Sequence, residues 1–369
     1  MTGVQTCALP IYLEPIRAEI DAAVARVLDS GWFILGPEGE AFERELAAAM
    51  GASEAVAVAN GTEAIQLALE ALGVGGGDEV ITSPMTAAFT GLAVLRAGAR
   101  PIFADLDPAT LNVSAEAVAK ALTPRSKALL PVNLYGHPAD LDPLLALARQ
   151  RGIPLIEDAC QAHGAQYKGR TVGAISGIGA HSFYPTKNLG AFGDAGAILV
   201  NDAELALRMR RLRNGGQTDR YHHLLAGINS RLDEIQAAIL RVKLRHLPAW
   251  TERRRALAAI YFRELDGAAV TLPREQPYAR AVYHLFVVRH KHRDALLAAL
   301  EQRGIGTLIH YPIPLHLQPA FATLGGKAGD FPVAEAAAAE ILSLPLYPEM
   351  TDDQARAVAA AVRELARTV

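Results

Sequence analysis

Seven short runs rich in valine and isoleucine, most of them separated by helical segments, restrict the fold of this 369-residue chain more than any other feature. They are AVAVAN, DEVITSP, RPIFADLD, KALLPVNLYG, PLIEDAC, AHSFYP and GAILVND, all between residues 55 and 202. The first five alternate with segments such as GTEAIQLALEALG, whose apolar residues follow helical spacing. This alternation predicts an α/β fold, with a mostly parallel seven-stranded sheet and helices on both faces. No helical segment separates the last two runs, so one of them can be antiparallel.

The rest of the chain predicts two domains. Helical patterns over residues 14–31 and 39–51 precede the first strand run, and a long helical pattern begins at Asp233 and is interrupted near Pro248. After it come a strand candidate, AVYHLFVVRH, and further helical segments. We therefore expect a large domain over residues 12–248 and a smaller C-terminal α/β domain over residues 249–369.

The first residues, MTGVQTCALPI, differ in kind from the rest. They lack the cationic start and the long apolar stretch of a secretory signal. Back-translated with GTG as the start codon, they resemble a sequencing-library adapter read through as protein. We expect residues 1–11, including Cys7, to be an artefact of this kind, without a part in the fold.

Composition excludes several classes of function. A formal net charge of −3 and the absence of a long basic run give no reason to expect nucleic acid or an anionic membrane as a partner. No apolar run reaches the roughly 18 residues of a spanning helix, which predicts a soluble, cytoplasmic protein. Two cysteines, Cys7 and Cys160, support neither a disulfide framework nor a cysteine zinc cage, and His163 has no partner at a suitable spacing. We expect no metal site.

Candidate functional residues follow the strand runs, because ligands in parallel α/β sheets collect at the carboxyl ends of the strands. Gly61, Thr62 and Glu63 open a helix after AVAVAN, where free amides can bind phosphate, although such a start is more often a plain cap. Asp158 ends a buried strand and requires a cationic or protonated partner; a structural salt bridge or a cap is an equal alternative. Lys187 follows AHSFYP, and Ser182, within that run, lies five residues before it. A phosphate site, a buried acid and an amine together suit pyridoxal 5′-phosphate.

Several motifs carry a family resemblance. NGTEAIQLAL, GDEVITSP, AGARPIFADLD, EDACQAHGA, SFYPTKNLGAFGDAGAI and GINSRLDEIQAAIL occur in this order. The chain resembles, from about Tyr12 to its C-terminus, the DegT/DnrJ/EryC1/StrS family of sugar aminotransferases. The resemblance implies the aspartate aminotransferase fold of pyridoxal-phosphate-dependent transferases.

The resemblance also implies roles for single residues. Lys187 matches the lysine that binds the cofactor as an imine and moves the proton between the cofactor and the substrate carbon. Asp158 matches the partner of the pyridine nitrogen, and Gln161 the residue beside the ring and phenolic oxygen. The matches to phosphate ligands are Ser182 and the turn of Gly61, Thr62 and Glu63, together with Asn229, which the neighbouring subunit supplies in the family. A homodimer with a shared active site is therefore expected.

Some positions depart from the family pattern or carry a weaker match. The family often places an aromatic ring over the cofactor at position 87; this chain has alanine there and Phe89 two residues later, which can substitute for that ring or belong to the core. Arg220 and Tyr221 lie in a polar, glycine-containing segment and are candidates for substrate contact, with a solvated loop face as the equal alternative. Tyr311 and His316 lie in HYPIPLHLQP, which is similar to a family segment near the active-site cleft.

Lysine at position 187 selects between two activities within the family. Members that act as sugar dehydratases carry histidine there, so the lysine implies transamination. The resemblance implies L-glutamate as amino donor and a keto sugar linked to a nucleoside diphosphate as acceptor, in amino-sugar or polysaccharide biosynthesis. A keto-cyclitol or another keto compound is an alternative acceptor, and a regulator that binds the cofactor without catalysis is an alternative of another class.

Overall fold

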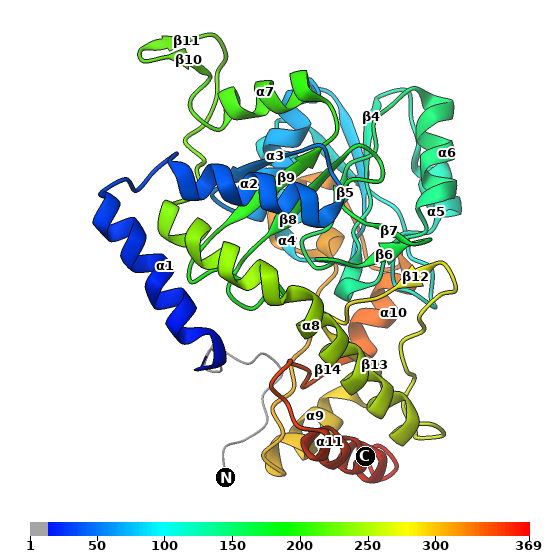
Figure 1. Cartoon of the computed structure of the whole chain (residues 1–369). Coiled ribbons are helices and arrows are strands. Elements are labelled where there is room, and N and C mark those ends of the chain that lie inside the picture. Colours follow the sequence, from blue (N-terminus) through cyan, green and yellow to red (C-terminus); the bar gives the residue numbers. More distant parts are fainter. Residues whose placement is uncertain (1–13) are drawn as a thin grey trace.

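The computed structural model describes residues 14–369, and the adapter-like segment 1–11 with Cys7 lies outside the described residues (Figure 1). Within 14–369, no helix is long and apolar enough to cross a membrane.

Two sheets form the centre of the larger part of the molecule. The first contains, in spatial order, β1 (Glu54–Val58), β9 (Gly196–Val200), β8 (Ile178–Ser182) and β5 (Glu157–Asp158). The second is parallel, with the order β3 (Arg100–Phe103), β2 (Glu79–Thr82) and β4 (Ser126–Leu130). Two isolated parallel bridges, Leu129 to Leu155 and Val132 to Asp158, lie between β4 and β5 and connect the sheets.

The predicted α/β class is confirmed, and the ladders refine its detail. β9 pairs antiparallel with both β1 and β8. This agrees with the absence of a helical segment between the last two predicted strand runs. The strands that correspond to the seven predicted runs divide into a four-stranded mixed sheet and a three-stranded parallel sheet, so the ladders do not confirm one seven-stranded sheet. The reason lies in β5, which forms a ladder of only two residues with β8 and meets β4 through single bridges.

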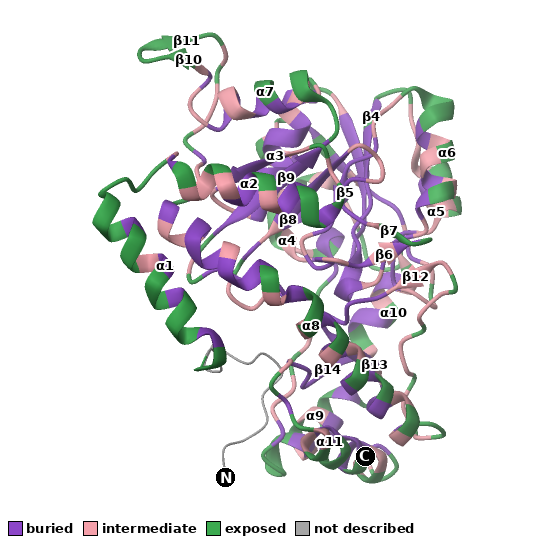
Figure 2. Ribbon diagram, viewed as in Figure 1, coloured by how far each residue is buried: buried purple, intermediate pink, exposed green. Residues whose placement is uncertain are grey.

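Helices cover both faces of the sheets, whose strands are largely buried (Figure 2). The core clusters show which helices pack against which face. Val56 and Val58 share a core cluster with one group of helices, whereas Ala55 and Ala57 share another cluster with a second group. This is the period of two that a strand buried on both faces requires. The first group contains α3 (Gly61–Ala71), α4 (Ala88–Arg96) and α7 (Ala203–Leu212), and the second α2 (Pro37–Met50) and α8 (Glu234–Glu264). The remaining helices of this part are α1 (Arg17–Ser30), which packs on α8, and α5 (Ala115–Ala121) and α6 (Leu141–Arg151), which cover the β4 side.

Helix α8 leads from the large part into the small one (Figure 1). It continues through Pro248 as one helix of 31 residues, so the expected interruption there is wrong and the predicted boundary at 248/249 falls inside a helix. The missing amide of Pro248 costs one helical hydrogen bond. Burial of the helix on both sides of it, at Leu247 and Thr251, offsets that loss. The small part has its own core. It lies between α8, the antiparallel strand pair of β13 (Phe286–Arg289) and β14 (Ile341–Leu344), α9 (Arg293–Gln302) and α11 (Asp352–Leu365).

The remaining elements are short. Three strands form a small antiparallel sheet, β12 (Ala279–Arg280), β6 (Gln166–Tyr167) and β7 (Arg170–Thr171). A hairpin of β10 (Gln217–Asp219) and β11 (His222–His223) projects from the body (Figure 1). Helix α10 (Pro332–Glu340) and the 3-10 turns η2 (Glu14–Ile16), η3 (Leu134–Gly136), η4 (Leu315–Leu317) and η5 (Pro319–Leu324) complete the list.

Glu234, the first residue of α8, fixes the start of another helix. Its buried carboxylate accepts hydrogen bonds from the amides of Gly36, Glu38 and Gly39, at distances of 2.8 to 2.9 Å. These amides belong to the first turn of α2 and have no acceptor within that helix. A negative charge at this position also compensates the positive end of the helix dipole.

We expect Glu234→Ala to lower the free energy of unfolding by about 3 kcal/mol, because it leaves buried amides without their charged acceptor. The measurement is the urea midpoint followed by circular dichroism. Glu40→Ala, on the exposed side of the same helix, is the matched control. Equal midpoints for the two variants would show that the carboxylate does not hold this helix start.

Candidate active site

The ends of β1 and β8 meet at one point of the sheet. Val58 and Ser182 both pair with Gly196, the first residue of the antiparallel β9. The chain turns from β1 into α3 directly above this point, so closely that a Cβ atom on Gly196 would lie 2.4 Å from the backbone of Asn60. At Gly61 a Cβ atom would lie 2.6 Å from Cβ of Ser182. Glycine at both positions is therefore a steric requirement of the contact between this helix start and this strand end.

The first turn of α3 presents donors at this contact. The side chain of Asn60 accepts a hydrogen bond from the Glu63 amide at 2.9 Å, which makes Asn60 the N-cap. Among the described residues, the amides of Gly61 and Thr62 have no acceptor. These two amides and the Ser182 hydroxyl form a donor set suited to a phosphate. Glu63 contributes its amide to the cap, while one oxygen of its carboxylate is buried without a hydrogen-bond partner.

Asp158 lies next to this contact and is 3% exposed. Its carboxylate accepts hydrogen bonds from the Thr90 hydroxyl at 2.8 Å and from the Cys160 amide at 3.1 Å. Among residues 14–369 it forms no ion pair, so the structural salt bridge considered from the sequence is absent from the described part. Both donors are neutral, and a buried carboxylate with only neutral donors still favours a cationic partner.

Thr90 is a residue that the sequence analysis missed. It lies on α4, one turn after Thr86, and the two hydroxyls are 3.3 Å apart. Both side chains are buried. The i, i+4 spacing of the two threonines at a helix start was a readable signal, since buried hydroxyls need partners.

Gln161 connects three segments of the chain. Its side-chain oxygen accepts a hydrogen bond from the Tyr135 amide at 2.9 Å, and its Nε2 donates to the Tyr311 hydroxyl at 3.2 Å. Tyr135 in turn donates through its hydroxyl to the carbonyl of His310. Two of the predicted site residues, Gln161 and Tyr311, are thus in contact, and Tyr135 is a further member that the sequence analysis did not name.

Lys187 follows β8 in a turn and is half-buried; its amide donates to the Tyr184 carbonyl at 2.8 Å. Its charge reaches several buried groups of the site. Burial lowers the pKa of His284 well below its ordinary value, with Lys187 the next cause. Burial also lowers the pKa of His310 to about 4, and again Lys187 contributes. The charge of Lys187 therefore acts on side chains that lie outside the sheet, at positions 284 and 310.

The surroundings of Cys160 and Glu157, the two residues on either side of the Asp158 segment, indicate structural roles. Burial raises the pKa of the Cys160 thiol well above its ordinary value, which favours the inert, small apolar role. Glu157 accepts hydrogen bonds from the amides of Gly173 and Ser176 and from the Ser176 hydroxyl, and burial raises its pKa. No group of three or more metal-ligating side chains occurs in the part of the chain that the structure describes.

Other predicted residues lie outside this cluster of contacts. The Phe89 ring is 63% exposed at the start of α4, where its neighbour Thr90 makes the contact with Asp158. Asn229 is exposed and pairs through its backbone with Asn214. Arg220 stacks on the exposed Tyr221 ring, with 5.4 Å between guanidinium and ring centre, in the projecting hairpin. His316 is buried, and its imidazole contacts Glu335 at 3.0 Å and the Phe331 ring.

The residues present fit pyridoxal phosphate on three observations. Gly61 leaves open the space beside Ser182 that a Cβ atom would fill, two amides of α3 have no acceptor within the described chain, and buried Asp158 has only neutral donors. Lys187 supplies the amine on the neighbouring strand end. Fold and site together define a pyridoxal-phosphate-dependent aminotransferase.

The chain belongs to the DegT/DnrJ/EryC1/StrS aminotransferase family, whose model matches residues 14–363. It is 51% identical to the dTDP-3-amino-3,4,6-trideoxy-alpha-D-glucose transaminase of Streptomyces venezuelae, over 96% of this chain and 94% of that protein. It is 50% identical to the erythromycin biosynthesis sensory transduction protein EryC1 of Saccharopolyspora erythraea, over 95% and 96%. Its structure is similar to that of S. venezuelae DesV in complex with a ketimine intermediate, with a TM-score of 0.98 and 50% identity over the whole of both chains.

We expect Gly61→Ala to reduce activity by roughly 10²-fold, because the added Cβ atom separates the helix start from Ser182 and so displaces the phosphate donors. Visible absorbance of the purified protein measures the cofactor retained, and circular dichroism checks the fold. The control is Gly76→Ala, where an added Cβ atom meets nothing within 4 Å. Full cofactor retention in Gly61→Ala would contradict the assignment of this contact.

We expect Thr90→Val to lower kcat about tenfold, since it removes one of the two hydrogen bonds that orient the Asp158 carboxylate. Thr90→Ser keeps the hydroxyl and is expected to restore most of the rate. Steady-state kinetics of the three proteins make the comparison. If valine and serine give the same rate, the hydroxyl has no part in positioning Asp158.

Proposed function

We propose that this aminotransferase transfers an amino group from L-glutamate to the C3 keto group of a dTDP-linked sugar. The observation that carries the proposal is Lys187, the amine that transamination requires, in a turn next to the phosphate donors and close to Asp158 in the sheet. The choice of sugar and carbon is supported by the name of the S. venezuelae transaminase, to which the chain is 51% identical.

Pyridoxal phosphate, when bound, supplies an electron-accepting ring that stabilises negative charge at the substrate carbon. We propose that Asp158 keeps the ring nitrogen protonated, because its buried carboxylate lacks any other cationic partner among the described residues. Lys187 takes a proton from the Cα atom of glutamate and later gives one to C3 of the sugar. Gln161 would contact the ring, and its side-chain amide is oriented by Tyr135 and Tyr311. The amides of Gly61 and Thr62, with Ser182, bind the phosphate.

We further propose that the working unit is a cytoplasmic homodimer in which the partner completes the site. Asn229 is exposed in the single chain, as a residue that reaches into a neighbouring subunit would be. Near the start of α2 the side chains of Trp32, Phe33 and Ile34 are also exposed. Exposed apolar groups of this size are typical of surfaces that another chain covers. Phe89 remains a candidate for the ring over the cofactor, and Arg220 and Tyr221 remain candidates for substrate contact from the partner's side.

A regulator that binds the cofactor without catalysis is the second candidate, because the relative EryC1 is named as a sensory transduction protein. A regulator of that kind would not need the proton-transfer amine. In this chain Lys187, Asp158 and Ser182 are all present, so the observations favour the enzyme. A keto-cyclitol acceptor is favoured by no feature of the site.

We expect the wild-type protein to show a visible cofactor band that bleaches when L-glutamate is added. We expect Lys187→Ala to lose turnover by roughly 10³-fold or more, because no other amine follows this strand end to carry the proton. The assay couples glutamate to a panel of dTDP-linked 3-keto and 4-keto sugars, with product amines identified by mass spectrometry. Lys127→Ala, at an exposed lysine on β4, is the control.

The outcomes separate the parts of the proposal. A protein that gains no visible band from added cofactor would contradict the aminotransferase itself. Amination of the 4-keto sugars alone would contradict only the C3 assignment. Bleaching by glutamate without transfer to any sugar would contradict the acceptor class.

A further inference from the structure

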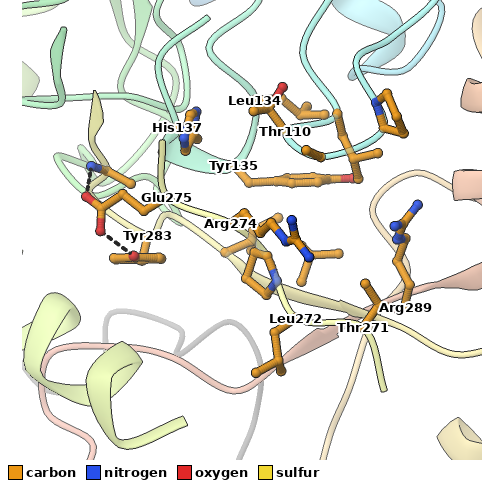
Figure 3. A pocket seen from close by; sticks show the side chains of 17 residues that line it. Thr110, Leu134, Tyr135, His137, Thr271, Leu272, Arg274, Glu275, Tyr283 and Arg289 are labelled. Atoms are coloured by element: carbon orange, nitrogen blue, oxygen red, sulfur yellow. Dashed lines mark hydrogen bonds between the residues drawn. The ribbon is translucent and has the colours of Figure 1, made fainter. Parts of the chain in front are cut away.

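A second cavity lies between the two parts of the molecule, apart from the cofactor site (Figure 3). Its volume is about 280 Å³. One wall comes from the large part, over residues 108–111 and the η3 turn, and the other comes from the small part, over residues 271–275 and 281–289. Of the residues described for the candidate active site, Tyr135 lines it, whereas Lys187, Asp158, Gln161, Ser182 and the first turn of α3 do not.

Its small-part wall changes from apolar to charged along residues 281–289. Ala281, Tyr283, Leu285, Val287 and Arg289 all line the cavity. Val287 and Arg289 are alternate residues of β13 and so lie on one face of that strand, which makes the wall a mostly apolar floor that ends at a guanidinium. The backbone of Thr271 pairs with that of Arg289 and holds this end in place.

The charge that faces the cavity is positive. Arg274 and Arg289 line it, and within residues 14–369 neither guanidinium has a hydrogen bond or an ion pair. Figure 3 shows both side chains extending beside the Tyr135 ring. In contrast, the Glu275 carboxylate already accepts hydrogen bonds from the Arg255 guanidinium at 2.7 Å, from the Tyr283 hydroxyl and from the Ala281 amide.

The other titratable groups near the cavity do not cancel this charge. His137 accepts a hydrogen bond from the Gln276 amide at Nε2 and donates from Nδ1 to the Pro138 carbonyl, so its ring is neutral. Burial lowers the pKa of His137, in agreement with that tautomer. The carboxylate of Asp107, at the edge of the large-part wall, is held by the amides of Ala109 and Thr110. Two arginines are thus left without an anion.

We propose that this cavity is a binding site for a small organic anion, whose carboxylate or phosphate oxygens bind Arg274 and Arg289 and whose carbon skeleton packs on the apolar row. Planar guanidinium groups suit both kinds of oxyanion, because their paired N–H groups match two oxygens at once. A volume near 300 Å³ is at the small end of ligand pockets and suits a metabolite rather than a macromolecule. The occupant would contact the face of Tyr135, whose amide is bound by Gln161. The site does not depend on the proposed transaminase activity.

Isothermal titration calorimetry of the holoenzyme tests the proposal with three probes: glutarate for dicarboxylates, inorganic phosphate, and thymidine diphosphate for nucleotides. We expect at least one probe to bind in the cavity at one molecule per chain, and the probe that binds identifies the source of the anion. We expect the double variant Arg274→Gln and Arg289→Gln to weaken that binding about tenfold or more, because it removes both charged donors. Ala109→Trp, which keeps the charges but fills the cavity, should weaken it as well.

Arg208→Gln, at an exposed arginine on α7, is the matched control and should bind like the wild type. If thymidine diphosphate also binds at the candidate active site, the stoichiometry rises to two molecules per chain. The cavity variants should then lose one of these two. The proposal is overturned if none of the three probes binds, or if the cavity variants bind as the control does. Circular dichroism and the cofactor band confirm that each variant is folded.

Discussion

The contact between the start of α3 and the end of β8 determines the geometry of the candidate active site. It exists because β9 runs antiparallel between β1 and β8, so that Val58 and Ser182 both pair with Gly196. Two strands that are distant in sequence therefore deliver a helix start and a hydroxyl to the same point. Glycine at position 61 lets them approach within van der Waals distance, and any Cβ atom there would separate them. The neighbouring strand β5 then brings Asp158 to the same edge, because Asp158 pairs with Ala180 on β8.

A second set of contacts ties the small part of the molecule to that edge. The η3 turn accepts hydrogen bonds from the amides of Val282 and Leu285, at the carbonyls of Gly136 and Tyr135. Tyr135 also donates its backbone amide to the side-chain oxygen of Gln161 and its hydroxyl to the carbonyl of His310. A single turn is thus bonded to the cofactor edge and to two segments of the small part. Displacement of the small part would therefore change the position of Gln161 through this turn. The proposed anion cavity is lined by the same turn.

The sequence predicted those features that local pattern determines. Helical spacing and valine-rich runs located the strands and helices. The positions after strand ends were the reason to propose Gly61, Asp158, Ser182 and Lys187 as site residues, since the carboxyl-end rule needs no three-dimensional information. The spacing of Thr86 and Thr90 indicated that these hydroxyls need partners, but it could not identify Asp158 as the partner of Thr90, because that contact depends on how α4 packs against β5. The break expected at Pro248 does not occur, because burial on both sides of that proline outweighs one lost hydrogen bond. His316 was chosen from a motif, and the structure shows it bonded to Glu335, a partner 19 residues away.

The charge state of four histidines affects the electrostatic surroundings of Lys187. The buried imidazoles of His163, His181 and His284 and the half-buried imidazole of His310 have pKa values that burial lowers below the ordinary range. At neutral pH these rings are uncharged, so they do not repel the amine. Lys187 is the second cause of the lowered pKa of His284 and of His310, which means that protonating either ring would be opposed by the lysine. The neutral histidines therefore leave Lys187 without a repelling neighbour among these four rings, which suits the proton-transfer role proposed for it.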